Sequence, residues 1–176
     1  MADIALWNGD ICDLEVDAIV SPASTSLWMA TGVAGAIKRR GGEAIEFAAV
    51  RQGPVGVGDA IVTPGGSLAA RWVIHAVSLD HVRRTDAVAI DRAVRNAFAR
   101  ARELGVETLA IPALGTGVGG FPMAEAARVT VAAVRAELAR SPRVTRVTFA
   151  LRGAVPYEAF RSALAAAPVP VAVSLP

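Results

Sequence analysis

The chain has 176 residues, of which 53% are hydrophobic and 19% charged, and its formal net charge at pH 7 is +2. These values indicate one folded domain and exclude intrinsic disorder. Cys12 is the only cysteine, and His75 and His81 are the only histidines, which excludes an internal disulfide framework and a zinc site built from several such residues. No apolar run approaches the ~20 residues of a membrane span, and the N-terminus does not resemble a signal peptide. We therefore expect a soluble, cytoplasmic protein with no metal and no membrane partner.

Almost all of the positive charge is carried by arginine, since Lys38 is the only lysine. Clustered arginines can mark a surface that binds phosphate or nucleic acid. Here they alternate with acids, as in Asp91-Arg92 and Arg102-Glu103, which is more typical of a solvated protein surface.

The first half of the chain alternates short strands and helices. Apolar periodicity predicts strands at residues 4–7 and 16–20, a polar segment at 21–26, helices at 32–40 and 43–52, and strands at 59–63 and 71–77. The last of these strands is almost continuously apolar from Trp72 to Val77, as expected of a strand covered on both faces.

The second half continues the alternation. Between Ile90 and Leu104 apolar residues recur every three or four positions, which predicts an amphipathic helix that Gly105 ends. A strand is expected at 108–111, a helix from Pro122 to about residue 140, a strand at 144–151 and a helix at 157–165. The alternation predicts an α/β sandwich around a mixed, largely parallel sheet, in one domain of residues 1–165. Residues 166–176, rich in Ala, Pro and Val, are expected to form a tail.

Two glycine-rich segments follow predicted strands and lead into predicted helices. They are Ala30-Thr31-Gly32-Val33-Ala34-Gly35-Ala36-Ile37 and Gly115-Thr116-Gly117-Val118-Gly119-Gly120-Phe121-Pro122. Ligands of open α/β sheets bind beyond the carboxyl ends of the strands, where a helix N-terminus offers free N–H groups and a positive dipole end. Glycine lets the backbone approach a phosphate closely. Two such loops facing each other would hold a diphosphate without a lysine, a metal or a further cofactor.

A dinucleotide-binding dehydrogenase is a weaker interpretation of the second segment. Gly115, Gly117 and Gly120 match the spacing G-x-G-x-x-G, but they lie two thirds along the chain. The next predicted strand ends at Arg152, where an acidic residue is expected in that class.

Asp10, directly after the first predicted strand, is the candidate for recognising a base. Its carboxylate can accept a hydrogen bond from an exocyclic amine such as that of adenine. Alternatively it caps backbone N–H groups of a turn, and the spacing alone favours this role. Of the remaining candidates, His75 is expected to be a core histidine and His81 to be exposed in a loop. Trp28 and Met29 either wall a ligand or pack on the core.

Four segments occur in a characteristic order: Gly9-Asp10-Ile11, Val16-Asp17-Ala18-Ile19-Val20, Gly32-Val33-Ala34-Gly35-Ala36-Ile37 and Pro112-Ala113-Leu114-Gly115-Thr116-Gly117-Val118-Gly119-Gly120. Together they resemble the macrodomain family, over nearly the whole chain. The resemblance implies a three-layer α/β/α fold that binds ADP-ribose in a cleft between two diphosphate-binding loops. The implied ADP-ribose-binding residues are Asp10, Ile11, Ser24, Gly32, Val33, Ala34, Gly115, Thr116, Gly117, Val118, Gly119, Phe121 and Arg152. Asp10 is implied to accept from the adenine amine, and Arg152 stands where the family often stacks an aromatic ring on adenine.

The chain departs from the family at positions linked to hydrolysis. The family usually reads Asn-Ala-Ala-Asn where this sequence reads Ser21-Pro22-Ala23-Ser24, and one hydrolytic class has an aspartate at the position of Ala34. We therefore expect binding of ADP-ribose, free or attached to a macromolecule, with no catalytic residue assigned. Two alternatives remain: an ADP-ribosyl hydrolase with a non-standard site, and a protein that binds RNA or poly(A) through the adenine pocket. The sequence favours a nucleic acid partner less than ADP-ribose.

Overall fold

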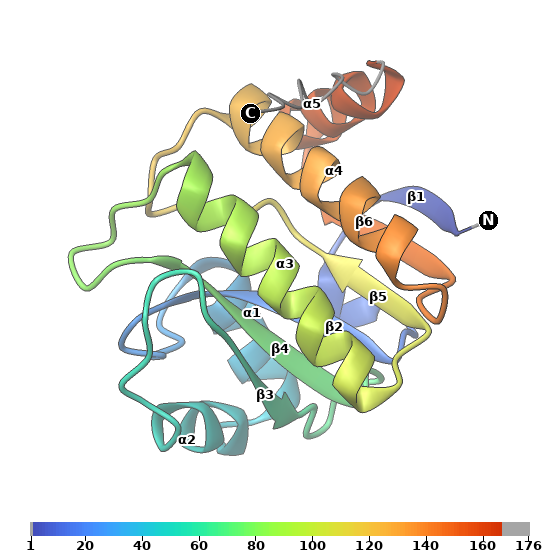
Figure 1. The fold of residues 1–176 in the computed structure, drawn as a ribbon. Coiled ribbons are helices and arrows are strands. Elements are labelled where there is room, and N and C mark those ends of the chain that lie inside the picture. Colours follow the sequence, from blue (N-terminus) through green and yellow to red (C-terminus); the bar gives the residue numbers. More distant parts are fainter. Residues whose placement is uncertain (1, 167–176) are drawn as a thin grey trace, which may run out of the picture.

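The computed structural model describes residues 2–166, so the predicted tail at 166–176 lies outside the described part except for Ala166. Within that part, six strands form one sheet in the order β1-β6-β5-β2-β4-β3 (Figure 1). The strands are β1 (Asp3–Asn8), β2 (Ala18–Ser24), β3 (Ala60–Pro64), β4 (Trp72–Leu79), β5 (Thr108–Ile111) and β6 (Arg146–Leu151). All neighbours are parallel except β3, which runs antiparallel to β4. The prediction of a mixed, largely parallel sheet is confirmed.

Helices cover both faces of the sheet, which confirms the predicted three-layer arrangement. The helices are α1 (Gly32–Gly41), α2 (Ala44–Val50), α3 (Ala87–Leu104), α4 (Met123–Arg140) and α5 (Ala154–Ala165). Figure 1 shows α3 and α4 side by side in front of the sheet, with α5 beside α4. Phe98 of α3 and Phe160 of α5 are buried in the core on that face, and Ile37 of α1 and Ile45 of α2 are buried on the other. Within residues 2–166, no helix is long and apolar enough to cross a membrane.

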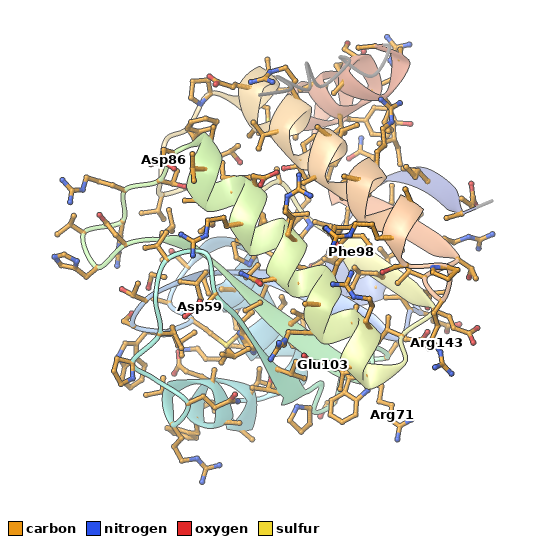
Figure 2. The ribbon with its side chains drawn as sticks, viewed as in Figure 1. Asp59, Arg71, Asp86, Phe98, Glu103 and Arg143 are labelled. Atoms are coloured by element: carbon orange, nitrogen blue, oxygen red, sulfur yellow. The ribbon has the colours of Figure 1, made fainter. Side chains whose placement is uncertain are left out.

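The predicted amphipathic helix is α3, and its ends show why it starts earlier than the apolar stripe. The carboxylate of Asp86 accepts the N–H of Ala89 at 2.7 Å and so caps the first turn. Gly105 ends the helix in the left-handed conformation, with φ +70°. Figure 2 places Asp86 and Glu103 near opposite ends of this helix, with Phe98 between them.

The polar loop expected at residues 21–26 is wrong for its first four residues, because β2 continues through Ser21 as far as Ser24. Pro22 lies within this strand and pairs with Ala76 of β4. On its other side, β2 pairs with β5 only near its start, so the missing N–H of Pro22 removes no ladder hydrogen bond there. The carboxyl end of β2 is therefore Ser24, four residues beyond the predicted end at Val20.

Candidate functional site

A cleft of about 640 Å³ opens at the carboxyl ends of the parallel strands. Taken across the sheet, its lining includes Gly9, Asp10 and Ile11 after β1, Leu151 and Arg152 at β6, residues within 112–119 after β5, residues within 22–28 at β2, and Leu79, His81 and Arg83 at β4. Residues within 30–39 of α1 and the loop before it form a wall. Four strand spacings separate β1 from β4, which puts the two ends of the cleft about 19 Å apart. The cleft is thus elongated, and the sheet order fixes the order of its residues.

All but one of the residues proposed from the sequence line this cleft. They are Asp10, Ile11, Ser24, Gly32, Val33, Ala34, Gly115, Thr116, Gly117, Val118, Gly119 and Arg152. Phe121 lies apart, because its partly buried ring packs against the core on the α3 and α4 face. Its N–H donates to the carbonyl of Gly115 at 2.9 Å, which closes the glycine loop.

Asp10 caps a turn, the role that its position in the sequence favoured, and it also lines the cleft. Its Oδ1 accepts the N–H of Cys12 at 2.9 Å and caps a short 3₁₀ turn. Arg40 Nη1 lies 3.7 Å from the other oxygen, while the same guanidinium binds Asp13 at 2.8 Å. The Cys12 N–H, aided by Arg40, holds the pKa of Asp10 below its ordinary value. The ionised carboxylate keeps further acceptor sites for a ligand.

The first glycine loop leads directly into α1. Gly32 begins this helix with φ +61°, and no heavy atom lies within 4 Å of the position that a Cβ would take. Thr31, the N-cap residue, makes no side-chain hydrogen bond to the helix. The first N–H groups of a helix lack intrahelical partners, so this end of α1 can donate to an anion.

The second glycine loop is built by close packing at two of its glycines. A Cβ on Gly115 would lie 2.9 Å from Ile90 Cδ1, and one on Gly119 would lie 2.7 Å from Leu79 Cδ2. Gly117 differs from both. No heavy atom lies within 4 Å of its Cβ position, and its φ is not in the left-handed region. Nothing in the protein fold requires a glycine at this position. The missing side chain instead leaves free space in the cleft.

Trp28 and Met29 divide between the two roles considered for them. Trp28 is 57% exposed and lines the cleft, whereas Met29 is 2% exposed and belongs to the core. The N–H of Met29 donates to the buried Glu46 carboxylate of α2 at 2.6 Å. Lys38 Nζ pairs with the same carboxylate at 3.1 Å, so the only lysine is engaged beside the cleft wall.

The loop after β4 is organised by Asp80. Its carboxylate accepts the N–H groups of Val82 and Arg84, at 2.9 and 2.8 Å, and Arg84 Nε at 2.9 Å. These bonds, above all the one from the Arg84 N–H, hold the pKa of Asp80 below its ordinary value. His81 is exposed, as predicted, and it lines the cleft together with Arg83.

The remaining titratable candidates lie below the surface. His75 is buried, and its Nε2 lies 2.9 Å from Thr63 Oγ1 while Nδ1 has no hydrogen-bond partner among the described residues. The core position predicted for it is found, but only one of its nitrogens is satisfied. Burial lowers the pKa of His75 to about 4. Burial also raises the pKa of Cys12 to about 12, so its thiol is not an activated nucleophile.

The fold is an α/β/α sandwich, and its cleft lies between two glycine-rich loops at the carboxyl ends of the parallel strands. The family model described as Macro domain matches residues 20–130, and the chain belongs to the macro domain family. A macro domain-containing protein of Streptomyces coelicolor is 41% identical over 171 residues, covering 93% of this chain and 99% of that protein.

Other similar proteins extend this comparison. An uncharacterized protein of Mycobacterium tuberculosis is 40% identical over 166 residues, covering 94% of this chain, but the match spans only 46% of that protein. Among solved structures, a Trypanosoma brucei macrodomain in complex with ADP-ribose has a TM-score of 0.85 at 27% identity, covering 92% of this chain and 68% of that one. An Oceanobacillus iheyensis macrodomain variant with ADPR has a TM-score of 0.84 at 25% identity, covering 91% and 90%.

Proposed function

We propose that this protein binds ADP-ribose, either free or as an ADP-ribosyl group on a macromolecule, in the cleft at the carboxyl ends of the strands. The observation that carries the proposal is Gly117, which lines the cleft although neither packing nor backbone conformation requires glycine there. A backbone without a Cβ allows close approach of a phosphate. Similar macrodomains crystallised with ADP-ribose and ADPR support the same ligand.

The order of the cleft residues fits the order of groups in ADP-ribose. Asp10 and Arg152 lie at the β1 and β6 end, where a carboxylate can accept from the adenine amine and a guanidinium can stack on the ring. The diphosphate then lies between Gly32 at the start of α1 and Gly117 after β5. The distal ribose lies near Ser24 at the end of β2.

We propose binding and not hydrolysis because of what surrounds Ser24. Its Oγ lies 2.9 Å from Ser26 Oγ, so the hydroxyl is paired with a second hydroxyl instead of a general base. Asp10 is the only carboxylate among the described residues that line the cleft, and it lies at the opposite end.

Isothermal titration with ADP-ribose, with AMP as the comparison ligand, tests the proposal. We expect ADP-ribose to bind at least about tenfold more tightly than AMP, because AMP lacks the second phosphate and the distal ribose, and tenfold corresponds to ~1.4 kcal/mol. Equal affinity for the two ligands, or no binding of either, would overturn the assignment of the glycine loops.

The same charged substitution made inside and outside the cleft distinguishes an effect on the second glycine loop from a general effect of charge. Gly117→Glu should weaken ADP-ribose binding by more than about tenfold, because a carboxylate beside the diphosphate repels it. Val88→Glu adds the same charge at a 65% exposed position outside the cleft and should bind like the parent. If Gly117→Glu binds ADP-ribose as tightly as Val88→Glu, the diphosphate does not lie at this loop.

A further inference from the structure

The cleft continues beyond the position proposed for the distal ribose. Trp28 follows β2, and His81 and Arg83 follow β4, four strands from the Asp10 end. This inference rests on the proposed function, which orients ADP-ribose with adenine at Asp10. Whatever carries the ADP-ribosyl group leaves the cleft past these three side chains. The chemistry of these side chains therefore indicates what kind of molecule bears the ADP-ribosyl group.

Trp28 is an exposed aromatic side chain on a firmly anchored backbone. The next residue, Met29, is fixed by burial in the core and by its 2.6 Å hydrogen bond to the Glu46 carboxylate, itself paired with Lys38. An indole 57% exposed on such a support offers a flat apolar surface at the cleft. Bases of single-stranded nucleic acids stack on aromatic side chains of this kind, with little regard to sequence.

Arg83, which lines the same cleft as Trp28, lies in a loop held by specific hydrogen bonds. Its φ of +64° is in the left-handed region, which a non-glycine residue adopts rarely and at some energetic cost. The N–H of Arg83 donates to the carbonyl of Asp80 at 3.0 Å, and the Asp80 carboxylate holds the rest of the loop. The protein thus maintains an unfavourable backbone conformation at a residue whose side chain lines the cleft.

The cleft carries an excess of positive charge. Arg39, Arg83 and Arg152 line it, and among the described residues none of the three forms an ion pair with a carboxylate. The one carboxylate of the described cleft lining, Asp10, lies at the other end. A carrier that passes Arg83 is therefore favoured if it is anionic.

We propose that Trp28, His81 and Arg83 form a subsite for a nucleotide joined to the distal ribose, so that the preferred ligand is an ADP-ribosyl group on a single-stranded nucleic acid. The base stacks on Trp28, and Arg83 and His81 donate to the adjoining phosphate. An acidic peptide would meet the charge of Arg83 but would leave the indole without a planar partner. The nucleic acid uses both features.

Binding of four ligands tests this subsite: ADP-ribose, a short oligonucleotide with an ADP-ribosyl group on its terminal phosphate, the same oligonucleotide unmodified, and an acidic peptide with an ADP-ribosyl group on glutamate. We expect the modified oligonucleotide to bind about fivefold to a hundredfold more tightly than ADP-ribose, the range that one stacked base supplies. The peptide, which meets Arg83 but not the indole, should gain less over ADP-ribose than the modified oligonucleotide does, and the unmodified oligonucleotide should bind more weakly than ADP-ribose or the peptide.

Variants locate the gain through the ratio of the two dissociation constants, ADP-ribose over modified oligonucleotide. Trp28→Ala should lower this ratio by about fivefold or more, the share of the stacked base, whereas Phe47→Ala, which removes an aromatic ring that is 56% exposed on α2, should leave it at the parent value. Arg83→Gln should lower this ratio. It should also reduce the slope of the logarithm of the ratio against the logarithm of the salt concentration, by somewhat less than the contribution of one phosphate contact. Arg143→Gln, near the far end of α3 in Figure 2, should change neither.

The outcomes separate this inference from the proposed function. If ADP-ribose binds and the modified oligonucleotide binds no more tightly, or the peptide gains as much, the nucleotide subsite is overturned and the proposed function stands. A ratio that survives Trp28→Ala overturns it as well. If neither ADP-ribose nor the modified oligonucleotide binds, both proposals fall.

Discussion

The Met29 N–H lies 2.6 Å from Glu46 Oε2, and this bond joins the cleft wall after β2 to α2. Because the carboxylate is buried and also binds Lys38, removing it leaves a buried N–H without a partner. Glu46→Ala should lower the free energy of unfolding by about 2–3 kcal/mol, the usual worth of a hydrogen bond to a charged group. Urea titration monitored by circular dichroism measures this change.

Glu46→Gln is the matched control for this bond. The amide oxygen still accepts from Met29, so only the difference between a charged and a neutral hydrogen bond is lost, about 1 kcal/mol. Equal stability of Glu46→Ala and the parent would show that the bond does not anchor the segment that carries Trp28.

Substitution by alanine should lower stability at one glycine of the second glycine loop and lower ligand affinity at another. Gly119→Ala puts a Cβ 2.7 Å from both Gly115 O and Leu79 Cδ2, and overpacking of this kind costs about 1–3 kcal/mol of stability. Gly117→Ala meets no atom within 4 Å and should leave the melting temperature unchanged while weakening ADP-ribose binding. Thermal unfolding and titration of both variants check the pair. A Gly117→Ala protein that unfolds more easily than Gly119→Ala would contradict this account.

The sequence predicted the elements that depend on local patterns. The apolar period of α3, the near-continuous apolar run of β4 and the two glycine loops are all periodic or compositional signals, and each element lies where it was expected within a few residues. The end of β2 was missed because Ser21 and Pro22 are residues typical of loops. Pro22 is tolerated in the strand because β5 pairs with β2 only as far as Ile19, so no hydrogen bond to β5 is lost there. That information depends on the partner strand and is not local.

The sequence predicted the cleft residues that act through their backbone better than those that act through their side chains. Glycines at strand-to-helix junctions carry a positional signal, whereas Arg39 and Arg83 look like other arginines in a chain rich in them. Arg83 becomes notable only through the Asp80 hydrogen bonds that shape its loop. Phe121 was placed in the site by its position in the motif, whereas its partly buried ring packs against the core.

His75 predicts a loss of stability in mild acid. Its pKa is about 4 in the folded protein against an ordinary value of 6.5, so below pH 6.5 the unfolded chain takes up a proton that the folded protein does not. The stabilisation is complete above pH 6.5 and is lost as the pH falls toward 4. Between pH 7 and 5 the free energy of unfolding should fall by about 2 kcal/mol.

The pH window isolates the histidine from the carboxylates. The pKa values of Asp10, Asp17 and Asp80 are lowered from 3.8, so these groups lose their contribution only at more acidic pH. Urea unfolding at pH 7, 6 and 5 gives the slope, and His75→Gln, which cannot titrate, should flatten it. A slope that is the same in the parent and in His75→Gln would show that the buried imidazole is not its source.

Asp10 predicts an exchange of base preference. In Asp10→Asn the amide oxygen can still accept the Cys12 N–H, and asparagine caps helical turns about as well as aspartate, so stability should hardly change. The other carboxylate oxygen, however, becomes an NH₂ donor that faces the donating amine of adenine. The affinity for ADP-ribose should therefore fall by about tenfold or more, the loss of a hydrogen bond to a charged group. The inosine analogue, whose base has a carbonyl in place of the amine, should bind Asp10→Asn more tightly than it binds the parent. Calorimetric titration of both proteins with both ligands gives the four affinities, and an unchanged preference for ADP-ribose would place the adenine amine away from Asp10.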